Sequence, residues 1–483
     1  MKKIIFRILF LSVIGLIVFS CNASRNTAEK DGTITLKIWE TYKDEHDLFI
    51  KIIAEFEKFY FEKYGEKIKI VSDRVPFDNI IENIKTACQV NTTPDIARLD
   101  SGKILELAYH KVLTQLDTLS CFEAKSIEEK KKQYLLGPFE TNVIKVKEAN
   151  GEWNDHLFGL PEQATCVALI WNKTMFKEKA DELKKAGLDP NRAPIDWDEA
   201  VEYGKILTIP SKQQYAFAFD NNLWFAFPFF NLYGAEFVGI DENKKFYCSI
   251  NSELGIAALQ KKIDLCSKKY DIEGKSTAIE AGSWKGGIGP DQGFINNNFA
   301  MIIMGAWYLK TFEKTVKDFG VSMIPKVSKK EAVALGMIQA NSTDEEYNKK
   351  ITTATNLGGN NLVIFKSCER RGKKYYKAAY EFINYFTSKE VQLRWGTELN
   401  QIPINIEAFE IYKNNPKLSD RERAFVEQVF YSKPSPKVPL SEKLYDVANI
   451  EMEQALNGKK TAKEALDKVA EKLNKEVFSL MNE

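Results

Sequence analysis

Apolar residues follow two alternating periods along the first quarter of the chain. Residues 33–39 (TITLKIW) form a β-rich run that predicts a strand, and the apolar positions between 49 and 59 then recur at helical spacing. The alternation continues with predicted strands at 68–71 and 95–99 and predicted helices at 79–90 and 104–110. Strands alternating with helices predict an α/β fold with a parallel sheet covered on both faces.

The rest of the chain shows further elements of both kinds. Asp196, with Glu199 three residues later, predicts a helix start, and Thr461-x-x-Glu464 is a capping box that predicts another. Further helices are expected at 223–232, 254–268 and 375–386, and buried strands at 166–171, 299–304, 320–324 and 362–365. Two segments lack an apolar period: we expect a mobile surface loop at 326–355 and a surface loop at 286–293 (GGIGPDQG).

Length and composition limit the class of protein. The 483 residues exceed what one hydrophobic core usually serves, so two lobes are expected. Lysine and arginine number 68 against 67 aspartate and glutamate residues, and 44% of the residues are hydrophobic, as in an ordinary globular protein. This balance indicates no nucleic-acid partner.

The N-terminus resembles that of an exported lipoprotein. Residues 1–20 combine a basic start with a short apolar run, which is typical of a signal peptide. The run ends at Ser20-Cys21, similar to the lipobox of bacterial lipoproteins, although Phe19 departs from the usual pattern. We expect lipidation of Cys21 and a flexible tether at 21–30, hence a chain anchored on the periplasmic or cell-surface side of a membrane. A secreted protein with an incidental Cys21 is the alternative.

The sequence offers no motif for a metal, a cofactor or a catalytic centre. The six remaining cysteines have no close spacing, so neither a zinc knuckle nor a specific disulfide is predicted. The three histidines are scattered, and nucleophile-elbow, zincin and phosphate-loop motifs are missing from the sequence. The run at 286–293 has Gln292 where a dinucleotide loop needs its third glycine.

Several segments, taken in order, resemble the family 1 extracellular solute-binding proteins, the maltose-binding-protein-like receptors of ABC importers. The segments are ITLKIWETYKDE, TPDIARLDSGKILELA, FGLPEQATCVALIWNKTMF, FPFFNLYGAEFV, INNNFAMIIMGAW, and NLGGNNLVIFK with AAYEFINYFTSKE. Ala306 departs from the proline that many relatives carry between glycine and tryptophan.

The resemblance implies a periplasmic-binding-protein fold of type II, with two α/β lobes, a central cleft and closure about a hinge. Carried onto this chain, it implies crossings near 164–168, 322–325 and 388. The first lobe would comprise residues 31–165 plus 325–388, and the second 166–324 plus 389–483. Ligand would lie in the cleft, and the permease subunits of the importer would be the protein partners.

The second lobe supplies aromatic candidates for the cleft. Trp307 follows the turn at Gly305 at the end of a predicted core strand, where open α/β sheets bind ligands. Spacing alone favours burial of Trp307, since large aromatics are mostly buried; the resemblance implies a cleft position. Trp224 is the second candidate, against an alternative in which its helix is wholly buried, and Asn222 could present an amide beside its ring. Asp291 and Trp284 are further candidates to reach the cleft.

The first lobe supplies polar candidates. Four of these residues follow predicted strands and so face one crevice: Glu40, Tyr42, Asp100 and Ser101. For any one of them, an ordinary solvated side chain is the alternative. Gln163 and Thr165 lie at the expected first crossing and would contact ligand or complete hinge hydrogen bonds. Gly358, Gly359 and Asn360 would let the backbone approach a ligand closely or, the safer interpretation, form a tight turn.

These features lead to one hypothesis and three alternatives. Together with the expected lipid on Cys21, the resemblance implies a monomeric, lipid-anchored receptor that captures a carbohydrate without transforming it. Because a sugar needs aromatic planes beside planar polar groups, the candidate residues agree with this expectation. A receptor for a polyamine or another cationic solute is the alternative within the binding class. A secreted glycoside hydrolase and an adhesive lipoprotein that reuses the fold are the others.

Overall fold

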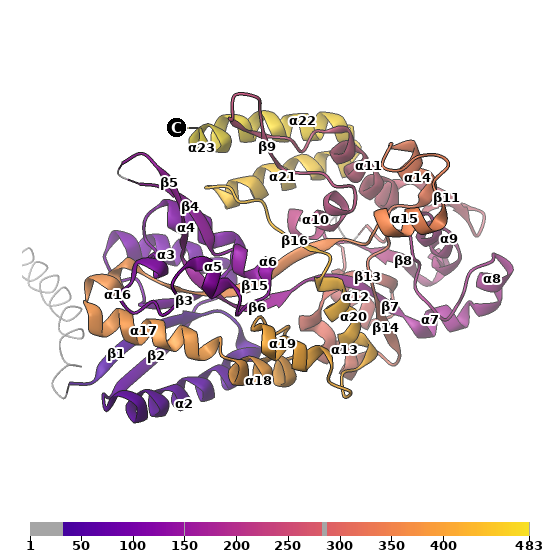
Figure 1. Ribbon diagram of the computed structural model, residues 1–483. Coiled ribbons are helices and arrows are strands. Elements are labelled where there is room, and N and C mark those ends of the chain that lie inside the picture. Colours follow the sequence, from indigo (N-terminus) through magenta and orange to yellow (C-terminus); the bar gives the residue numbers. More distant parts are fainter. Residues whose placement is uncertain (1–31, 149, 283–286, 483) are drawn as a thin grey trace, which may run out of the picture.

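The computed structural model describes residues 32–148, 150–282 and 287–482 and has two lobes (Figure 1). The first lobe is built on a six-stranded sheet and the second on a four-stranded sheet. The α/β class expected from the alternating periods is confirmed. The expected signal peptide, the tether and Cys21 lie outside the described residues.

The six-stranded sheet has the order β16-β15-β3-β1-β2, with β6 paired to β15. Its strands are β1 (Ile34–Glu40), β2 (Ile68–Arg74), β3 (Ile96–Asp100), β6 (Gly159–Thr165), β15 (Thr355–Ile364) and β16 (Ser432–Pro434). Strand β1 runs parallel to β2 and β3, but β15 runs antiparallel to both β3 and β6. The three strands predicted from the first quarter of the chain are parallel as expected, but the complete sheet is mixed, because β15 enters from far along the chain in the opposite direction.

The four-stranded sheet has the order β14-β7-β13-β8. Its strands are β7 (Val167–Asn172), β8 (Tyr215–Ala218), β13 (Phe299–Gly305) and β14 (Phe319–Ser322). Every residue of β13 is buried, which explains why its sequence is continuously apolar instead of alternating. Three two-stranded hairpins complete the strands: β4 (Val143–Lys147) with β5 (Trp153–Leu157), β9 (Val238–Ile240) with β10 (Phe246–Cys248), and β11 (Lys269–Ile272) with β12 (Lys275–Ala278).

Helices lie against both sheets (Figure 1). Those before β7 are α2 (His46–Tyr64), α3 (Ile80–Gln89), α4 (Ile104–Tyr109), α5 (Ile127–Lys131) and α6 (Leu136–Glu140). Those from β7 to β14 are α7 (Lys173–Glu178), α8 (Ala180–Lys185), α9 (Trp197–Leu207), α10 (Leu223–Leu232), α11 (Glu253–Ser267), α12 (Pro290–Ile295) and α13 (Leu309–Thr315). After β14 come α14 (Lys329–Ala334), α15 (Asp344–Lys350), α16 (Lys366–Arg370), α17 (Lys373–Phe386), α18 (Lys389–Leu399), α19 (Ile406–Lys413), α20 (Asp420–Val429), α21 (Ser441–Leu456), α22 (Ala462–Leu473) and α23 (Ser479–Met481). Both predicted helix starts, at Asp196 and Thr461, carry the expected side-chain cap.

The segment 326–355 is not the mobile loop that its composition suggested. It contains α14 and α15, and its sparse apolar residues, among them Val327, Ala332 and Tyr347, belong to the same core cluster as Leu169 of β7 and Met301 of β13. Because this core lies in the second lobe, we propose that the first lobe resumes at β15 instead of at residue 325.

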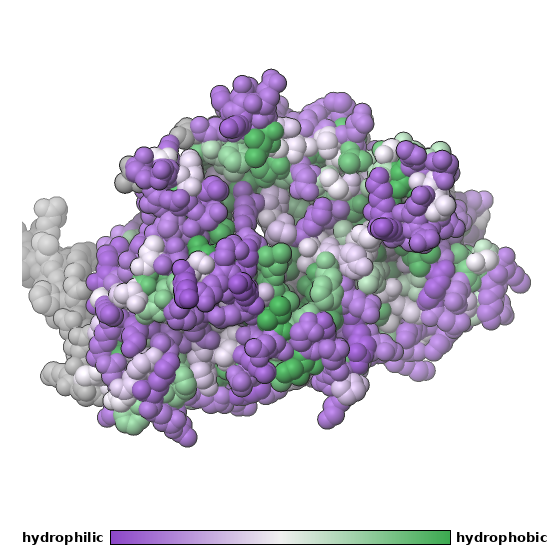
Figure 2. Space-filling view, in the orientation of Figure 1, coloured by the Kyte–Doolittle hydropathy of each residue, from purple (hydrophilic) through white to green (hydrophobic). Residues whose placement is uncertain are grey.

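We also propose that a short segment within the range expected for the second lobe belongs to the first lobe. Strand β16, at Ser432–Pro434, pairs with Thr355–Leu357 of β15 in the six-stranded sheet before α21 and α22 pack against α11 of the second lobe. Figure 2 shows apolar side chains gathered in the middle of the view, where the two lobes meet, on an otherwise mostly hydrophilic face. In the part of the chain that the structure describes, no helix combines the length and apolar character needed to cross a membrane.

Candidate functional site

A cavity of about 1360 Å³ lies between the two lobes. The first lobe lines it with the segment after β1, the end of β3, the end of β6 and the middle of β15. The second lobe lines it with the start of α10, the segment after β13 and the start of α21. The cleft therefore gathers residues that lie more than 300 positions apart in the sequence, as Tyr42 and Asn360 do.

Two indole rings form the apolar part of the second-lobe wall. Trp224 lies in the first turn of α10, and Trp307 lies in a short 3₁₀ helix, Ala306–Tyr308, directly after β13. Their ring centroids are 5.7 Å apart and their planes are inclined by 52°. Trp307 is 42% exposed and lines the cavity, so its ring faces the cleft and not the core. The pair gives the cleft a broad aromatic surface.

Glycines behind the two rings allow this arrangement. A β-carbon on Gly305 would lie 1.9 Å from the ring of Trp307, so the indole can fold back over the end of β13 because residue 305 has no side chain. A β-carbon on Gly358 would lie 3.0 Å from the ring of Trp224. Both rings thus rest against bare backbone, one from each lobe.

Polar groups form the facing first-lobe wall. The Tyr42 hydroxyl donates a hydrogen bond to Asn360 Oδ1 at 3.2 Å. Asp100 accepts the backbone N–H of Gly102 at 2.8 Å, and burial raises the pKa of its carboxyl above the ordinary value. Gln163 contributes an amide from β6. These groups can donate to and accept from a neutral, hydrogen-bonding ligand.

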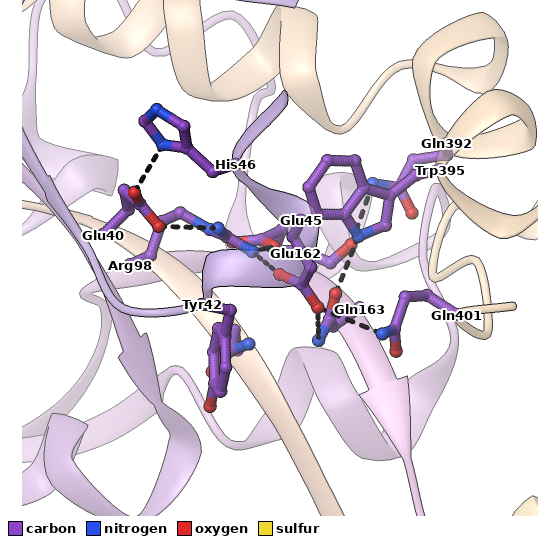
Figure 3. Close-up of polar contacts among 11 residues, drawn as sticks. Glu40, Tyr42, Glu45, His46, Arg98, Glu162, Gln163, Gln392, Trp395 and Gln401 are labelled. Carbon is purple, nitrogen blue, oxygen red and sulfur yellow. Dashed lines mark hydrogen bonds and ion pairs between the residues drawn. The ribbon is translucent and has the colours of Figure 1, made fainter. Parts of the chain in front are cut away.

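A buried charged group lies beneath this wall (Figure 3). Arg98 of β3 is fully buried; its Nε donates to Glu162 Oε2 at 2.7 Å, and its Nη2 contacts both Glu162 and Glu45. Glu40 Oε2 lies 3.8 Å from Arg98 Nη1, and Glu40 Oε1 lies 2.8 Å from His46 Nδ1. We call Glu40, Glu45, Arg98 and Glu162 the Arg98 cluster. Pairing is what makes such buried charges tolerable.

Two glutamines connect the Arg98 cluster to the cleft surface. Glu45 Oε1 accepts hydrogen bonds from Gln163 Nε2 at 3.3 Å and from Gln401 Nε2 at 3.0 Å. Gln163 Oε1 in turn accepts the indole N–H of Trp395 at 2.7 Å. Since Glu45 and both glutamines line the cleft, its polar wall is held in place from below (Figure 3).

The carboxylates of the Arg98 cluster outnumber its cation. Burial raises the pKa of Glu162 to about 7; the charge and hydrogen bonds of Arg98 oppose this rise, and the neighbouring Glu45 and Glu40 add to it. Burial also raises the pKa of Tyr42, and the charges of Asp100 and Glu45 act in the same direction. The Tyr42 hydroxyl therefore stays protonated and available as a donor.

Comparison with known proteins identifies the family. The model of the bacterial extracellular solute-binding proteins matches residues 42–393, more than half of the 483-residue chain. The chain belongs to this family. The resemblance drawn from the sequence segments is thereby confirmed, and members of this family are binding proteins.

Relatives of this solute-binding protein are distant in sequence but cover most of its length. A galactooligosaccharide-binding protein of Bacillus subtilis (strain 168) is 21% identical over 476 residues, which is 95% of this chain and 94% of the relative. The sn-glycerol-3-phosphate-binding periplasmic protein UgpB of Yersinia pseudotuberculosis is 24% identical over 335 residues, 64% of this chain and 65% of the relative. The GacH receptor of Streptomyces glaucescens GLA.O shares the fold with a TM-score of 0.66 at 19% identity, covering 92% of this chain and 98% of that one.

The structure brings most of the expected site residues of this solute-binding protein together. Those that line the cleft are Tyr42, Asp100, Gln163, Thr165, Trp224, Trp307, Gly359 and Asn360. Residues 358–360 belong to strand β15, so the tight turn taken as the safer interpretation is wrong. Gly359 has a φ of 147°, and a β-carbon there would lie 2.1 Å from the carbonyl oxygen of Gln163, so this glycine allows β15 to lie close to β6.

Three expected site residues lie elsewhere. Glu40 is fully buried in the Arg98 cluster, because its strand end turns it toward Arg98 instead of the cleft. Ser101 faces a small crevice beside residues 434–438. Asn222 caps α10: its Oδ1 accepts the N–H of Phe225 at 3.1 Å, and its amide donates to Asp220. These three side chains do not line the cleft.

The segment 286–293 also differs from expectation. Its second half begins α12 at Pro290, and Asp291 there accepts the hydroxyl of Tyr308 at 2.8 Å without lining the cleft. Trp284 lies outside the described residues. Within the described residues, no group of three or more histidine, cysteine, aspartate or glutamate side chains could hold a metal ion.

Sequence reasoning missed the Arg98 cluster and the contribution of α21. Arg98 stands between Ala97 and Leu99 in a buried strand, and Glu162 stands in the buried strand β6. A charged residue flanked by apolar neighbours inside a predicted strand was the available signal. Tyr445 and Asp446 of α21 line the cleft, but nothing in the local sequence distinguishes them from other helix-surface residues.

Proposed function

We propose that this solute-binding protein is the receptor of an ABC importer and captures a carbohydrate between its lobes. The observation that carries the proposal is the pairing of two indole rings on one wall with neutral and acidic hydrogen-bonding groups on the other. A sugar ring has an apolar C–H face and a rim of hydroxyls, so it fits between such walls. Unpaired hydroxyls would cost about 1 to 3 kcal/mol each, and the polar wall supplies their partners.

The size of the cleft favours an oligosaccharide over a single sugar. Its volume of about 1360 Å³ exceeds that of typical pockets for drug-sized molecules, which are about 300 to 1000 Å³. The relative from Bacillus subtilis is named for galactooligosaccharides, and GacH was solved in complex with acarbose. Both names support a carbohydrate of more than one ring.

The role of the chain would be transport and not chemistry. We propose that no bond is made or broken, and that ligand contact with both lobes favours the closed form, which the permease subunits of the importer then recognise. A lipid on Cys21 would hold the monomer at the membrane. Loss of residues 1–20 removes three basic side chains and leaves a slightly acidic protein, so the lipid would have to provide the membrane attachment.

Intrinsic fluorescence and calorimetry test the ligand class directly. The purified protein without its signal peptide is titrated with galactose, galactotriose and maltotetraose, and with spermidine and sn-glycerol 3-phosphate. We expect a tryptophan signal and micromolar binding, about −8 kcal/mol, for at least one oligosaccharide. Binding of spermidine or glycerol phosphate with no response to any sugar would overturn the proposal.

A cationic solute is the second candidate because of the charge of the cleft. Its lining contains six carboxylates, from Asp44, Glu45, Asp47, Asp100, Glu442 and Asp446, against four lysines. Aromatic rings beside carboxylates also suit an ammonium group. The spermidine titration separates this candidate from the first.

A further inference from the structure

The Arg98 cluster buries three carboxyl groups beside a single guanidinium group. Glu40, Arg98 and Glu162 are fully buried and Glu45 is 6% exposed, so water screens them little. If all three carboxyls were ionised, one guanidinium would face three negative charges. Glu40 Oε2 and Arg98 Nη1 have no hydrogen-bond partner, although both atoms are buried. Such an arrangement is relieved by one bound proton.

The groups around Glu162 determine where that proton resides. From β3, Arg98 faces it; from the 3₁₀ helix at residues 43–45, Glu45; and from β1, Glu40. Residue Tyr42 lies against the guanidinium, and Gln392 of α18 donates to the backbone carbonyl of Glu162 and not to its carboxyl. His46 pairs with Glu40 at the outer edge of the cluster. Burial raises the pKa of Glu162 to about 7 against the charge of Arg98, and the two neighbouring carboxylates add to the rise, so this carboxyl is the group that retains the proton.

The cluster is connected to the cleft through Glu45. Its Oε2 contacts Arg98, while its Oε1 accepts hydrogen bonds from the amides of Gln163 and Gln401. The side chains of Glu45, Gln163 and Gln401 line the cavity. A ligand hydroxyl that donates to Glu45 withdraws negative charge from the cluster. The neighbouring Glu162 then holds its proton less tightly.

We propose that ligand binding in the cleft is linked to release of a proton from the Arg98 cluster, so that affinity rises with pH across neutrality. This inference rests on the proposed capture of a hydroxyl-bearing ligand. The linkage is reciprocal: protonation of the cluster weakens ligand binding by the same factor by which the ligand promotes deprotonation.

The first measurement needs no ligand. Because the folded protein holds a proton on Glu162 up to about pH 7 and an unfolded chain releases it near pH 4.3, the folded form gains stability at low pH and loses it as pH rises to 7. As the pH is raised from 5.5 to 8, we expect the thermal unfolding midpoint of the wild type to decrease relative to that of Glu162→Gln. The control is Glu55→Gln, which changes an exposed carboxylate of α2 that pairs with Arg394, and its pH profile should follow that of the wild type.

The second measurement uses galactotriose and maltotetraose as probes. Between pH 6 and 8 we expect the affinity of the wild type to rise by about three- to tenfold, with proton release seen by calorimetry in two buffers of different ionisation enthalpy. Glu162→Gln should show a flat profile, and Glu45→Gln should move the midpoint of the stability profile to lower pH, because the charge that raises the Glu162 pKa is removed. A variant that lost only structural support would change affinity equally at every pH.

Each result decides one part of the inference. Equal pH profiles in the wild type and Glu162→Gln would overturn it. If neither sugar binds at any pH, the proposed function and the linkage both fail, and the unfolding midpoints still decide whether the cluster holds the proton. If Glu162→Gln does not fold, the shift with Glu45→Gln gives the same test.

Discussion

The two walls of the cleft are built on opposite physical principles. On the second-lobe wall, Trp224 and Trp307 present apolar rings that lie against glycine backbone, and Trp307 is partly exposed. On the first-lobe wall, Gln163 and Glu45 present polar groups that are held by a buried guanidinium. The aromatic wall depends on two glycines, Gly305 and Gly358, which have no side chain and so leave room for the indole rings. The polar wall depends on the paired charges of the Arg98 cluster, which would be costly to separate. We therefore expect substitutions on the two walls to have different effects.

The largest effect is expected from Arg98→Met. The change leaves three buried carboxyls without their cation, and removal of one partner from a buried pair costs about 3 to 5 kcal/mol in free energy of unfolding. Denaturant unfolding at pH 7.5 measures this loss. Arg394→Met removes an exposed partner of Glu55 and should cost at most about 1 kcal/mol, so equal losses in the two variants would contradict the comparison.

Removal of an indole should affect binding more than stability. Trp224→Ala and Trp307→Ala should each weaken binding of the best oligosaccharide by about 2 kcal/mol, roughly 30-fold, as expected for a central aromatic contact. Titration calorimetry checks this. Trp153 of the hairpin β4–β5 is 52% exposed and does not line the cleft, so Trp153→Ala should bind like the wild type. If Trp224→Ala and Trp307→Ala both bind with the affinity of the wild type, the two rings do not contact the ligand.

Gly305→Ala adds one methyl group beneath the indole of Trp307 and tests whether the bare backbone there positions the ring. The new β-carbon would lie 1.9 Å from the present ring of Trp307, which must swing away. Because the ring is partly exposed, we expect little loss of stability and about a fivefold loss of affinity, near 1 kcal/mol. In a double-mutant cycle with Trp307→Ala, the glycine substitution should add nothing, and an independent loss would exclude an effect through the ring.

The smallest effect concerns the place where the two walls touch. Glu442 at the start of α21 lies 2.9 Å from Lys103 and 3.5 Å from Lys85, both of the first lobe. These side chains are partly exposed, so Glu442→Gln should cost about 0.2 to 1 kcal/mol, and the difference should vanish in about 1 M salt because of screening. Thermal unfolding at low and high salt tests it; a loss that salt leaves unchanged would contradict an ionic contact.

The parts of the molecule that depend on local pattern were predictable from the sequence. The apolar run at Phe299–Gly305 is a buried strand, and Trp307 reaches the cleft directly after it. Helix α10 spans the residues expected for it, from Leu223 to Leu232. In these cases, periodicity and capping act within a few residues of the element they define.

The parts that depend on distant partners were not predictable. Arg98 lies 53 residues from Glu45 and 64 from Glu162, so no local pattern shows that its charge is buried and paired. The apolar residues of 326–355 are too sparse for a period, and they become core because the second lobe provides their neighbours. Asn222 has the chemistry of a ligand contact, but the N–H groups at the start of α10 use it as a cap.

Because one link between the lobes is very short, a rotation about it would move different parts of the cleft by different amounts. Cys166 alone separates β6 of one sheet from β7 of the other, and it is fully buried. In any rotation about this link, atoms close to the axis travel little and atoms far from it sweep long arcs. Gln163 and Thr165 lie three and one positions from this link, so their contacts with a bound ligand would change little during such a rotation. Residues at the outer rims of the cleft would undergo the largest displacements.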